Sequence, residues 1–276
     1  MKWNRFIASQ FGKPSGISGI VATFIMNRMN GKLYRYVEDK LSLKLGEKVL
    51  DIGFGNGSFI RRLSGIGNGN KIYGIDISED MLKVAVKKNR NAVLQGRMDL
   101  KVGDVISLPY EDSTFDKIYT INTLYFWKDP VKGLKEIGRV LNPDGKCFLV
   151  GYEKEWLDKI PCTRYGFRKY DFPAILRMID KAGLVIVNTE PIEERKSYGM
   201  TISRHPYSLL SCKFLDYSGR NSGSHAVIGN IFTYDGACSY NAAVAYCHPG
   251  TYHRTSSNPA VVSYTDRFSM FYSGSP

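Results

Sequence analysis

Hydrophobic positions follow two alternating spacings along the first 206 residues of this 276-residue chain. Short apolar runs between polar or glycine-rich segments are typical of buried strands, whereas apolar residues three and four apart indicate one face of a helix. The predicted strands are Lys48–Ile52, Lys71–Ile75, Leu100–Val102, Phe115–Ile121, Lys146–Gly151, Leu184–Thr189 and Tyr198–Ser203. The predicted helices are residues 17–29, Lys32–Leu43, Ser58–Leu63, the stretch after Ser78 through Lys88, Val131–Leu141 and Asp171–Ala182.

Local signals support two of these helix ends. Ser78 is a good N-cap, and Glu79 and Asp80 follow it in the first helical turn. Asn142-Pro-Asp-Gly145 is a strong turn signal that ends the helix before it. Because strands alternate with helices, the pattern predicts a parallel sheet covered on both faces. Ligands of such sheets bind at the carboxyl ends of the strands, so the loops after the first four strands are the place to look for a site.

The loop after the first strand has three glycines within five residues, in Asp51-Ile-Gly-Phe-Gly-Asn-Gly57. Glycine lets the backbone turn sharply and come close to a ligand. A dinucleotide-binding fingerprint would need its third glycine at position 58, where this chain has serine. By itself the loop indicates either a nucleotide-like ligand or a plain strand-to-helix turn.

Polar residues also follow the next three strands. Asp76 comes 19 residues after Gly57, where a carboxylate can accept hydrogen bonds from both ribose hydroxyls of NAD or of S-adenosylmethionine (SAM). A hydrogen bond to such a charged acceptor contributes about 1.5–3 kcal/mol. Asp104, in Gly103-Asp-Val105, can accept a bond from an adenine amine. The segment Asn122-Thr-Leu-Tyr-Phe-Trp127 either meets the reacting groups or supplies packing residues.

In this order the segments resemble class I SAM-dependent methyltransferases, and Leu108-Pro109, Phe115-Asp116 and Leu141-Asn-Pro-Asp-Gly145 add to the likeness. The branch that they resemble most is the small-molecule group that includes ubiquinone/menaquinone C-methyltransferases. The resemblance covers residues 30–205. It implies a Rossmann-like, doubly wound sheet of seven strands with the last one antiparallel, and an enzyme that methylates a small, apolar or aromatic acceptor.

The resemblance also implies which residues hold SAM. The methionine part would be held by Asp51, Gly53, Phe54, Gly55, Asn56 and Gly57, and the ribose by Asp76. Asp104 and Val105 would hold the adenine, with Ile77 and Met81 near it, and Asn122 would lie beside the sulfonium. Gly103 and Thr123 are also expected to bind the cofactor. Amino-group methylases that act on bases carry Asn-Pro-Pro-Tyr where this chain has Asn122-Thr-Leu-Tyr125, which argues against DNA adenine methylation.

Methyl transfer requires alignment of donor and acceptor and exclusion of water, and some members add a general base. The sequence does not single out a base; the candidates are Tyr125, Tyr165, Tyr170 and His205. Residues 1–43 are expected to form a helical lid over the carboxyl edge of the sheet, with core packing as the alternative use of their apolar face. Residues 44–206 are then the SAM-binding methyltransferase domain.

Composition changes after residue 206. Residues 207–276 have one Lys, three Arg, three Asp and no Glu, but three of the five cysteines and three of the four histidines. Cys238, Cys247, His248 and His253 match no zinc-ligand spacing, so we predict no metal site. This C-terminal extension is atypical of the family, and it is either a small separate segment or a poorly ordered one.

The net charge of +12 leaves an anionic partner open, although no run of Lys and Arg is longer than two. The alternatives to a small-molecule enzyme are therefore an RNA methyltransferase, which lacks a recognisable RNA-binding appendage here, and a non-catalytic SAM-binding protein, which the intact motifs disfavour. No apolar run approaches the roughly 18 residues that a membrane span needs. Without a secretory signal or a disulfide framework, the cytoplasm is the expected location.

Overall fold

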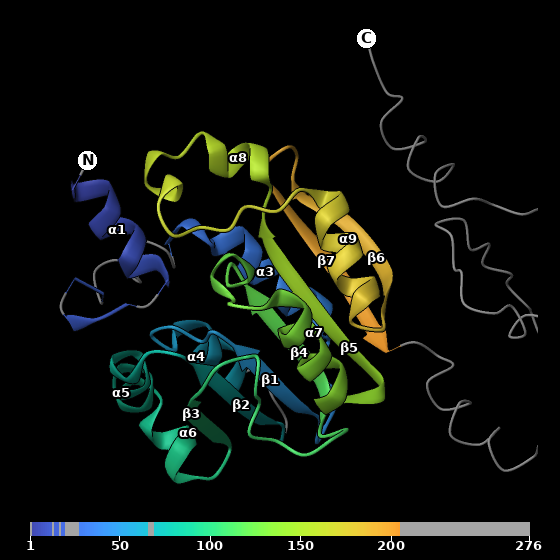
Figure 1. The fold of residues 1–276 in the computed structure, drawn as a ribbon. Coiled ribbons are helices and arrows are strands. Elements are labelled where there is room, and N and C mark those ends of the chain that lie inside the picture. The colour runs from blue at the N-terminus through green and yellow to red at the C-terminus, as the bar shows by residue number, and fades with distance from the viewer. Residues whose placement is uncertain (1, 13, 17, 20–27, 66–68, 205–276) are drawn as a thin grey trace, which may run out of the picture. The chain divides into compact units, whose positions relative to one another are not determined.

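The computed structural model describes residues 2–12, 14–16, 18–19, 28–65 and 69–204. Most of the predicted helix over residues 17–29 lies outside the described residues, as do His205 and the whole extension over residues 207–276. The described residues form one mixed sheet with helices on both faces (Figure 1). None of the described helices has the length and apolar character that crossing a membrane requires.

The sheet contains seven strands in the order β3-β2-β1-β4-β5-β7-β6. The strands are β1 (Lys48–Ile52), β2 (Lys71–Asp76), β3 (Met98–Val102), β4 (Phe115–Ile121), β5 (Leu141–Tyr152), β6 (Leu184–Glu193) and β7 (Ser197–Arg204). Strands β1 to β5 pair in parallel, and β7 pairs antiparallel with both β5 and β6. The predicted Rossmann-like sheet of seven strands, with the last one antiparallel, is therefore confirmed.

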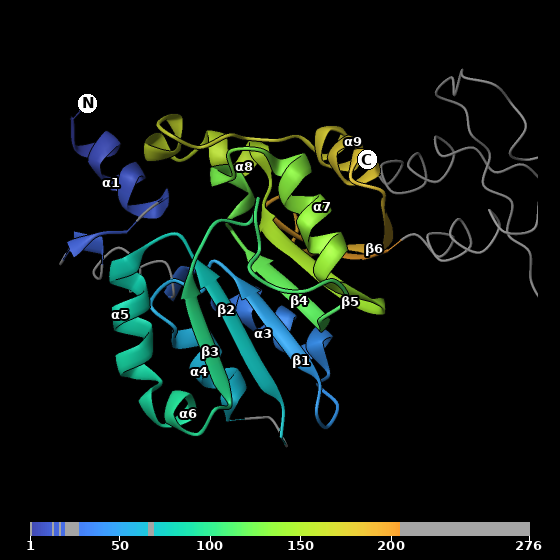
Figure 2. The same ribbon diagram turned by 60° about the horizontal axis from the view of Figure 1, so that its bottom comes forward.

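Helices cover both faces of the sheet because side chains alternate along each strand. On β5, Phe148 and Val150 pack in the core cluster with α3 (Gly31–Leu41), α4 (Ser58–Ser64), α5 (Glu79–Lys88) and α6 (Arg90–Leu94). Cys147 and Leu149, the alternate residues, pack in the other cluster with α7 (Pro130–Val140) and α9 (Phe172–Lys181). Figure 2 shows the two layers from a second direction.

The remaining elements are short, apart from the first helix. They are α1 (Lys2–Gly12), α8 (Lys154–Asp158) and the 3-10 helices η1 (Leu124–Phe126) and η2 (Pro161–Arg164). Among the short elements, α6 and α8 have five residues each, which is too few for an apolar period to distinguish a helix from a loop. The predicted N-cap is confirmed, since the Oγ of Ser78 accepts a hydrogen bond from the backbone N–H of Met81.

The turn predicted at residues 142–145 takes a different form, because β5 runs through these residues without a break. Leu141 pairs with Phe115 of β4, and Lys146 pairs with Lys117. Four residues of β5 therefore lie opposite a single residue of β4, and the segment bulges out of the ladder. The turn residues fit this bulge, but strand pairing on either side continues the strand.

Candidate functional site

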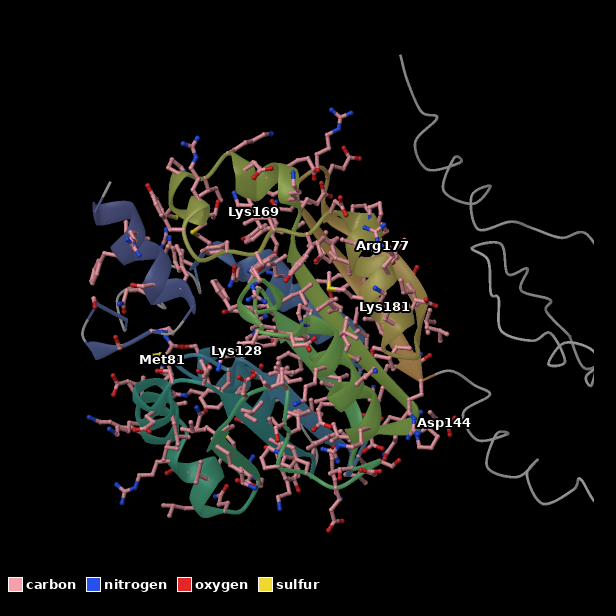
Figure 3. All side chains as sticks on the ribbon, in the orientation of Figure 1. Met81, Lys128, Asp144, Lys169, Arg177 and Lys181 are labelled. Atoms are coloured by element: carbon pink, nitrogen blue, oxygen red, sulfur yellow. The ribbon has the colours of Figure 1, made fainter. Side chains whose placement is uncertain are left out.

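The four loops singled out in the sequence meet at one edge of the sheet. Strand β1 pairs in parallel with β2 and β4, and β2 pairs in parallel with β3, so the carboxyl ends of these strands lie side by side. Figure 3 shows Met81 and Lys128 toward this edge, whereas Asp144 in the bulge of β5 lies at the opposite end of the sheet. The structure thus brings the predicted cofactor residues of all four loops together.

The glycine-rich loop after β1 has a backbone that only glycine adopts readily. Gly53, Gly55 and Gly57 have φ angles of +86°, +55° and +70°. A Cβ atom on Gly53 would lie 2.4 Å from the Cγ2 of Thr123, so the loops after β1 and β4 are in close contact there. A Cβ atom on Gly55 would meet no atom of the described residues within 4 Å. The backbone at Gly55 therefore borders open space that a ligand can enter.

Asp76 ties this loop to the start of α5. Its Oδ2 accepts a hydrogen bond from the N–H of Gly55 at 2.8 Å, and its Oδ1 accepts one from the N–H of Ser78 at 2.9 Å. Burial raises the pKa of this carboxyl, and the bonds from Ser78 and Gly55 oppose that rise. The backbone N–H of Ile77 is a third donor to this carboxyl. A carboxylate has about four acceptor positions, so Asp76 can still accept a hydrogen bond from a ribose hydroxyl.

Asp51, on β1, is a buried carboxyl with one strong partner. Its Oδ2 accepts a hydrogen bond of 2.7 Å from the hydroxyl of Tyr119. Burial raises the pKa of Asp51 to about 8; the bond from Tyr119 opposes this rise and the nearby carboxylate of Asp76 adds to it. No Lys or Arg is among the groups that shift this pKa. A cationic ligand group beside Asp51 would therefore gain a buried counter-ion.

The loop after β3 supplies one partly accessible carboxylate. The N–H of Gly103 donates to the carbonyl of Asp76 at 3.0 Å, which joins the loops after β2 and β3. Asp104 is half-buried, its Oδ1 accepts from the N–H of Ile106 at 3.3 Å, and Lys128 lies 4.0 Å from its Oδ2. Val105 is buried in the cluster with α7 and α9. Of the three predicted residues Gly103, Asp104 and Val105, only Asp104 therefore offers a polar side chain to a ligand.

The other predicted adenine neighbours, Ile77 and Met81, differ in exposure. Met81 is fully buried at the start of α5, whereas Ile77 is 39% exposed. Phe54 and Asn56, in the glycine-rich loop, are both buried, and the Oδ1 of Asn56 accepts a hydrogen bond from the N–H of Ser58. Ile77 is therefore the apolar residue of this set with surface left for a planar ring.

The loop after β4 is held by its own side chains. Asn122 has a φ angle of +59°, and its Nδ2 donates a hydrogen bond of 2.9 Å to the Oδ1 of Asn30. The Oγ1 of Thr123 accepts a bond of 3.0 Å from the indole N–H of Trp127 and shares a hydrogen bond with the hydroxyl of Thr120. Both predicted residues thus have fixed positions before any ligand binds.

The candidate bases lie in different surroundings. The hydroxyl of Tyr125 donates to the carbonyl of Tyr152 at 3.0 Å and accepts from its N–H, and burial raises the pKa of Tyr125 well above its usual value. This arrangement favours a role for Tyr125 in holding β5 rather than in taking a proton. Tyr165 is half-buried after η2, and Tyr170 packs against the core cluster with α7 and α9. His205 lies outside the described residues.

Several site residues had no sequence signal. Asn30, which precedes α3, accepts hydrogen bonds from Asn122 and from the hydroxyl of Tyr152, the latter at 3.3 Å. Tyr119 sits inside a strand whose apolar run suggested packing alone. Asn30 and Asn122 are 92 residues apart in the chain, and no local pattern pairs residues over such a distance.

The described residues 2–12 and 14–16, which we call the N-terminal segment, contact the carboxyl edge of the sheet at two places. Phe11 of α1 packs edge-on against Phe167 at 6.1 Å, and Phe167 packs against Phe126 of η1 at 4.6 Å, both between ring centroids. On the other side, the hydroxyl of Ser78 donates to the carbonyl of Pro14 at 2.6 Å. We call Phe11, Tyr125, Phe126 and Phe167 the aromatic cluster; the ring of Tyr125 stacks on Phe167 at 5.9 Å.

In sequence, the chain is similar to known methyltransferases. A family model described as a methyltransferase domain matches residues 50–149. An uncharacterised methyltransferase of Bacillus subtilis is 30% identical over 136 residues, which is 49% of this chain and 73% of that protein. A ubiquinone/menaquinone biosynthesis C-methyltransferase of Pasteurella multocida is 26% identical over 203 residues, 73% of this chain and 72% of that protein. A SAM-dependent methyltransferase structure from Aquifex aeolicus has a TM-score of 0.53 and 26% identity, and the match covers 61% of this chain and 88% of that one.

Proposed function

Since this chain belongs to the class I methyltransferases that use SAM, we propose that it transfers the methyl group to a small apolar or aromatic acceptor bound beside the aromatic cluster. The chain is a SAM-dependent enzyme, and SAM is its cofactor. When bound, SAM supplies a methyl group on a sulfonium, which an acceptor displaces in line. The protein's own task is then to orient the two molecules and to exclude water.

The residues of the candidate site fit SAM. Open space borders Gly55, Asp76 keeps acceptor capacity, and no Lys or Arg of the described residues shifts the pKa of the buried Asp51. We therefore assign Asp51 to the cationic amine of the methionine part and Asp76 to the ribose hydroxyls. Asp104 and Ile77 would contact the adenine, and Asn122 with Thr123 would border the sulfonium end.

The ribose assignment can be tested at Asp76. Asp76→Asn keeps the size of the side chain but removes the charge that would strengthen a hydrogen bond from the ribose. We expect the Kd for SAM to rise about 10- to 100-fold, because a bond to a charged acceptor contributes about 1.5–3 kcal/mol. Calorimetric titration with SAM would measure this change. Asp144→Asn, in the bulge at the opposite end of the sheet, is the matched control and should leave the Kd unchanged; equal Kd values for Asp76→Asn and the native protein would refute the assignment.

The proposal of an apolar or aromatic acceptor rests on the aromatic cluster. Phe11, Phe126 and Phe167 are half-buried, they come from three separate segments, and Phe126 belongs to the loop after β4. An apolar surface assembled at the reacting edge suits a flat ring better than a charged or sugar-like acceptor. The name of the Pasteurella relative, a quinone-pathway C-methyltransferase, agrees with this class. A quinone- or phenol-type ring is our first candidate.

We also propose that the N-terminal segment acts as the lid. The N–H of Gly16 donates to the Oδ2 of Asp80 at 3.0 Å, and the carbonyl of Pro14 accepts from Ser78. A Cβ atom on Gly12 would lie 3.0 Å from the ring of Phe126. These contacts reach the loops after β2 and β4, and they support a role for the segment in shielding the cofactor and the acceptor from water.

Methyl transfer from labelled SAM to small-molecule, lipid, RNA and protein fractions of a cell extract would identify the acceptor class. We expect product in the organic-soluble fraction. Phe126→Leu and Phe167→Leu should raise the KM for that acceptor about tenfold and leave the KM for SAM unchanged, because an aromatic pair contributes about 0.5–1.5 kcal/mol beyond its buried area. Phe172→Leu, on α9, is the control. Label confined to RNA or protein would exclude the proposal.

A cationic surface on α7 and α9 favours RNA as the alternative acceptor. Lys132 and Lys135 on α7 and Arg177 and Lys181 on α9 are exposed, and none of them forms an ion pair within the part of the chain that the structure describes. Figure 3 shows Arg177 and Lys181 along α9. If RNA is the acceptor, turnover should fall steeply with salt and should fall again when these four cations are replaced by Gln. Salt-insensitive turnover would exclude RNA.

A further inference from the structure

A groove on the outer side of α5 and α6 combines apolar and cationic side chains. It has a volume of about 560 Å³ and is lined by Leu82, Lys83, Val86, Lys87, Arg90, Val93 and Leu94. We call these seven residues the α5–α6 groove. Figures 1 and 2 both show the two helices at the β3 side of the sheet, away from α9 and β6. No residue of this groove belongs to the cofactor or acceptor site described above.

The groove follows from how the two helices pack. Met81 and Ala85 point into the protein and are fully buried, so Leu82 and Val86, each one residue further along α5, lie beside the buried face and remain half-exposed. The chain then turns at Asn89, whose Nδ2 donates to the carbonyl of Gly57 at 3.1 Å. After this turn α6 presents Leu94, which is 73% exposed. The apolar stripe of α5 therefore continues onto α6, and no element among the described residues covers it.

The charged residues that line the groove, Lys83, Lys87 and Arg90, are all cations. Residues 81–98 include five Lys or Arg and no Asp or Glu. Lys87 and Arg90 have no ion-pair partner among the described residues, and Lys83 reaches only Asp80, at 3.9 Å, with 74% of its side chain exposed. An isolated exposed leucine is ordinary on a protein surface. An apolar groove bordered by three cations, two of them without an ion-pair partner among the described residues, suits a partner with both apolar and anionic parts.

We propose that the α5–α6 groove docks this protein on a membrane surface that carries anionic lipid headgroups. The headgroup phosphates contact Lys83, Lys87 and Arg90, while Leu94 and Val93 enter the boundary between headgroups and acyl chains. A nucleic acid would neutralise the cations but would leave the apolar lining exposed to water. The unpaired cations on α7 and α9 have no large exposed apolar residue beside them on those helices. They therefore lack the apolar contact that docking on a membrane requires.

Flotation of the full chain with lipid vesicles tests the proposal. The vesicles are phosphatidylcholine alone, or phosphatidylcholine mixed with phosphatidylglycerol. We expect binding to the mixed vesicles that weakens as salt increases, and little binding to phosphatidylcholine alone. Lys83→Gln, Lys87→Gln and Arg90→Gln together should lower the partition coefficient about 100-fold, which corresponds to about fivefold for each cation. Leu94→Ser should lower it about fivefold at any salt concentration, since it removes only the apolar contact.

Matched variants elsewhere on the surface serve as controls. Lys132→Gln with Lys135→Gln removes two exposed, unpaired cations from α7, and Val187→Ser removes an apolar side chain that is 54% exposed on β6. Both controls should bind the mixed vesicles as the native protein does. The groove variants should keep the native circular dichroism and the native Kd for SAM, which shows that they fold.

Three results would overturn the proposal. Equal binding to both kinds of vesicle would show that anionic headgroups are not recognised. An equal loss of binding with the α7 control pair would show attraction to any anionic surface through net charge alone. Loss of binding with the triple variant together with native binding by Leu94→Ser would show a purely electrostatic surface, as expected for a nucleic-acid partner.

Discussion

At the scale of single residues, Asp51 links the stability of the protein to pH. Burial raises the pKa of this carboxyl from 3.8 to about 8. An acid whose pKa is higher in the folded chain binds its proton more tightly there, so raising the pH from about 4 to about 8 removes stability. The pKa of Asp76 is shifted in the same direction, also because of burial.

We therefore expect the free energy of unfolding of SAM-free protein to fall between pH 5 and pH 8. Asp51 alone can contribute up to about 1.4 kcal/mol per pH unit over this range. Asp51→Asn, which cannot ionise, should show a smaller fall. Urea unfolding at a series of pH values measures this slope. An unchanged slope in Asp51→Asn would mean that Asp51 is already ionised at pH 5.

Tyr119→Phe is the complementary variant for the same carboxyl. The hydroxyl of Tyr119 stabilises the ionised form of Asp51, so its removal should raise the pKa of Asp51 further. The fall in stability should then extend to higher pH than in the native protein. Asp144→Asn, which alters an exposed carboxylate, should keep the native slope and so serves both variants as a control.

Gly53 cannot be replaced by a larger residue without a steric clash. Its φ angle of +86° disfavours any other residue, and a Cβ atom there would lie 2.4 Å from the Cγ2 of Thr123. Gly46 has a similar φ angle of +80° but open space around it. We expect Gly46→Ala to cost about 1–2 kcal/mol through its backbone alone.

Gly53→Ala should cost more than Gly46→Ala and should also abolish tight SAM binding, because the methyl group displaces the loop after β4. Urea unfolding and calorimetric titration with SAM separate the two effects. Equal losses of stability, with native SAM affinity in both variants, would show that the contact between Gly53 and Thr123 has no part in the site.

At the scale of elements, Ser78 both caps the start of α5 and holds the N-terminal segment. The Oγ of Ser78 accepts from the N–H of Met81 at 3.3 Å and donates to the carbonyl of Pro14 at 2.6 Å. Asp171 caps α9 in the same way, through the N–H of Ala174, and lies on the other face of the sheet. The two caps form a natural pair for comparison.

We expect Ser78→Ala and Asp171→Ala each to lower the free energy of unfolding by about 1 kcal/mol through loss of the cap. Only Ser78→Ala should also weaken SAM binding, since it releases residues 14–16 from the carboxyl edge. Urea unfolding and SAM titration on both variants distinguish these outcomes. If the two variants bind SAM equally well, the proposed lid does not contribute to holding the cofactor.

At the scale of the whole molecule, the last strand of the described sheet ends at Arg204, and the four site loops lie between β1 and α7. A chain that ends after residue 206 should therefore fold and bind SAM with the native Kd. Thermal unfolding with and without SAM would measure both properties. Loss of SAM binding in this shortened chain would show that residues 207–276 are part of the catalytic unit rather than an appendage.

The sequence alone determined the features that depend on near neighbours. The periods of Lys48–Ile52 and Phe115–Ile121 gave strands with the same bounds in the structure, and Ser78 marked the start of α5. The glycine spacing and the polar residue after each parallel strand predicted that the site lies at the carboxyl edge of the sheet. The carboxyl ends of neighbouring parallel strands must lie together there.

Only the tertiary structure decided what depends on contacts between distant segments. The hydrogen bond from Tyr119 to Asp51, the bond from Asn122 to Asn30 and the packing of Phe11 on Phe167 each join parts of the chain far apart in sequence. Strand pairing likewise made the turn at residues 142–145 a bulge. Periodicity reports the burial of one face, whereas the partner that covers that face, and the charge state of a group such as Asp51 within it, depend on how the whole chain folds.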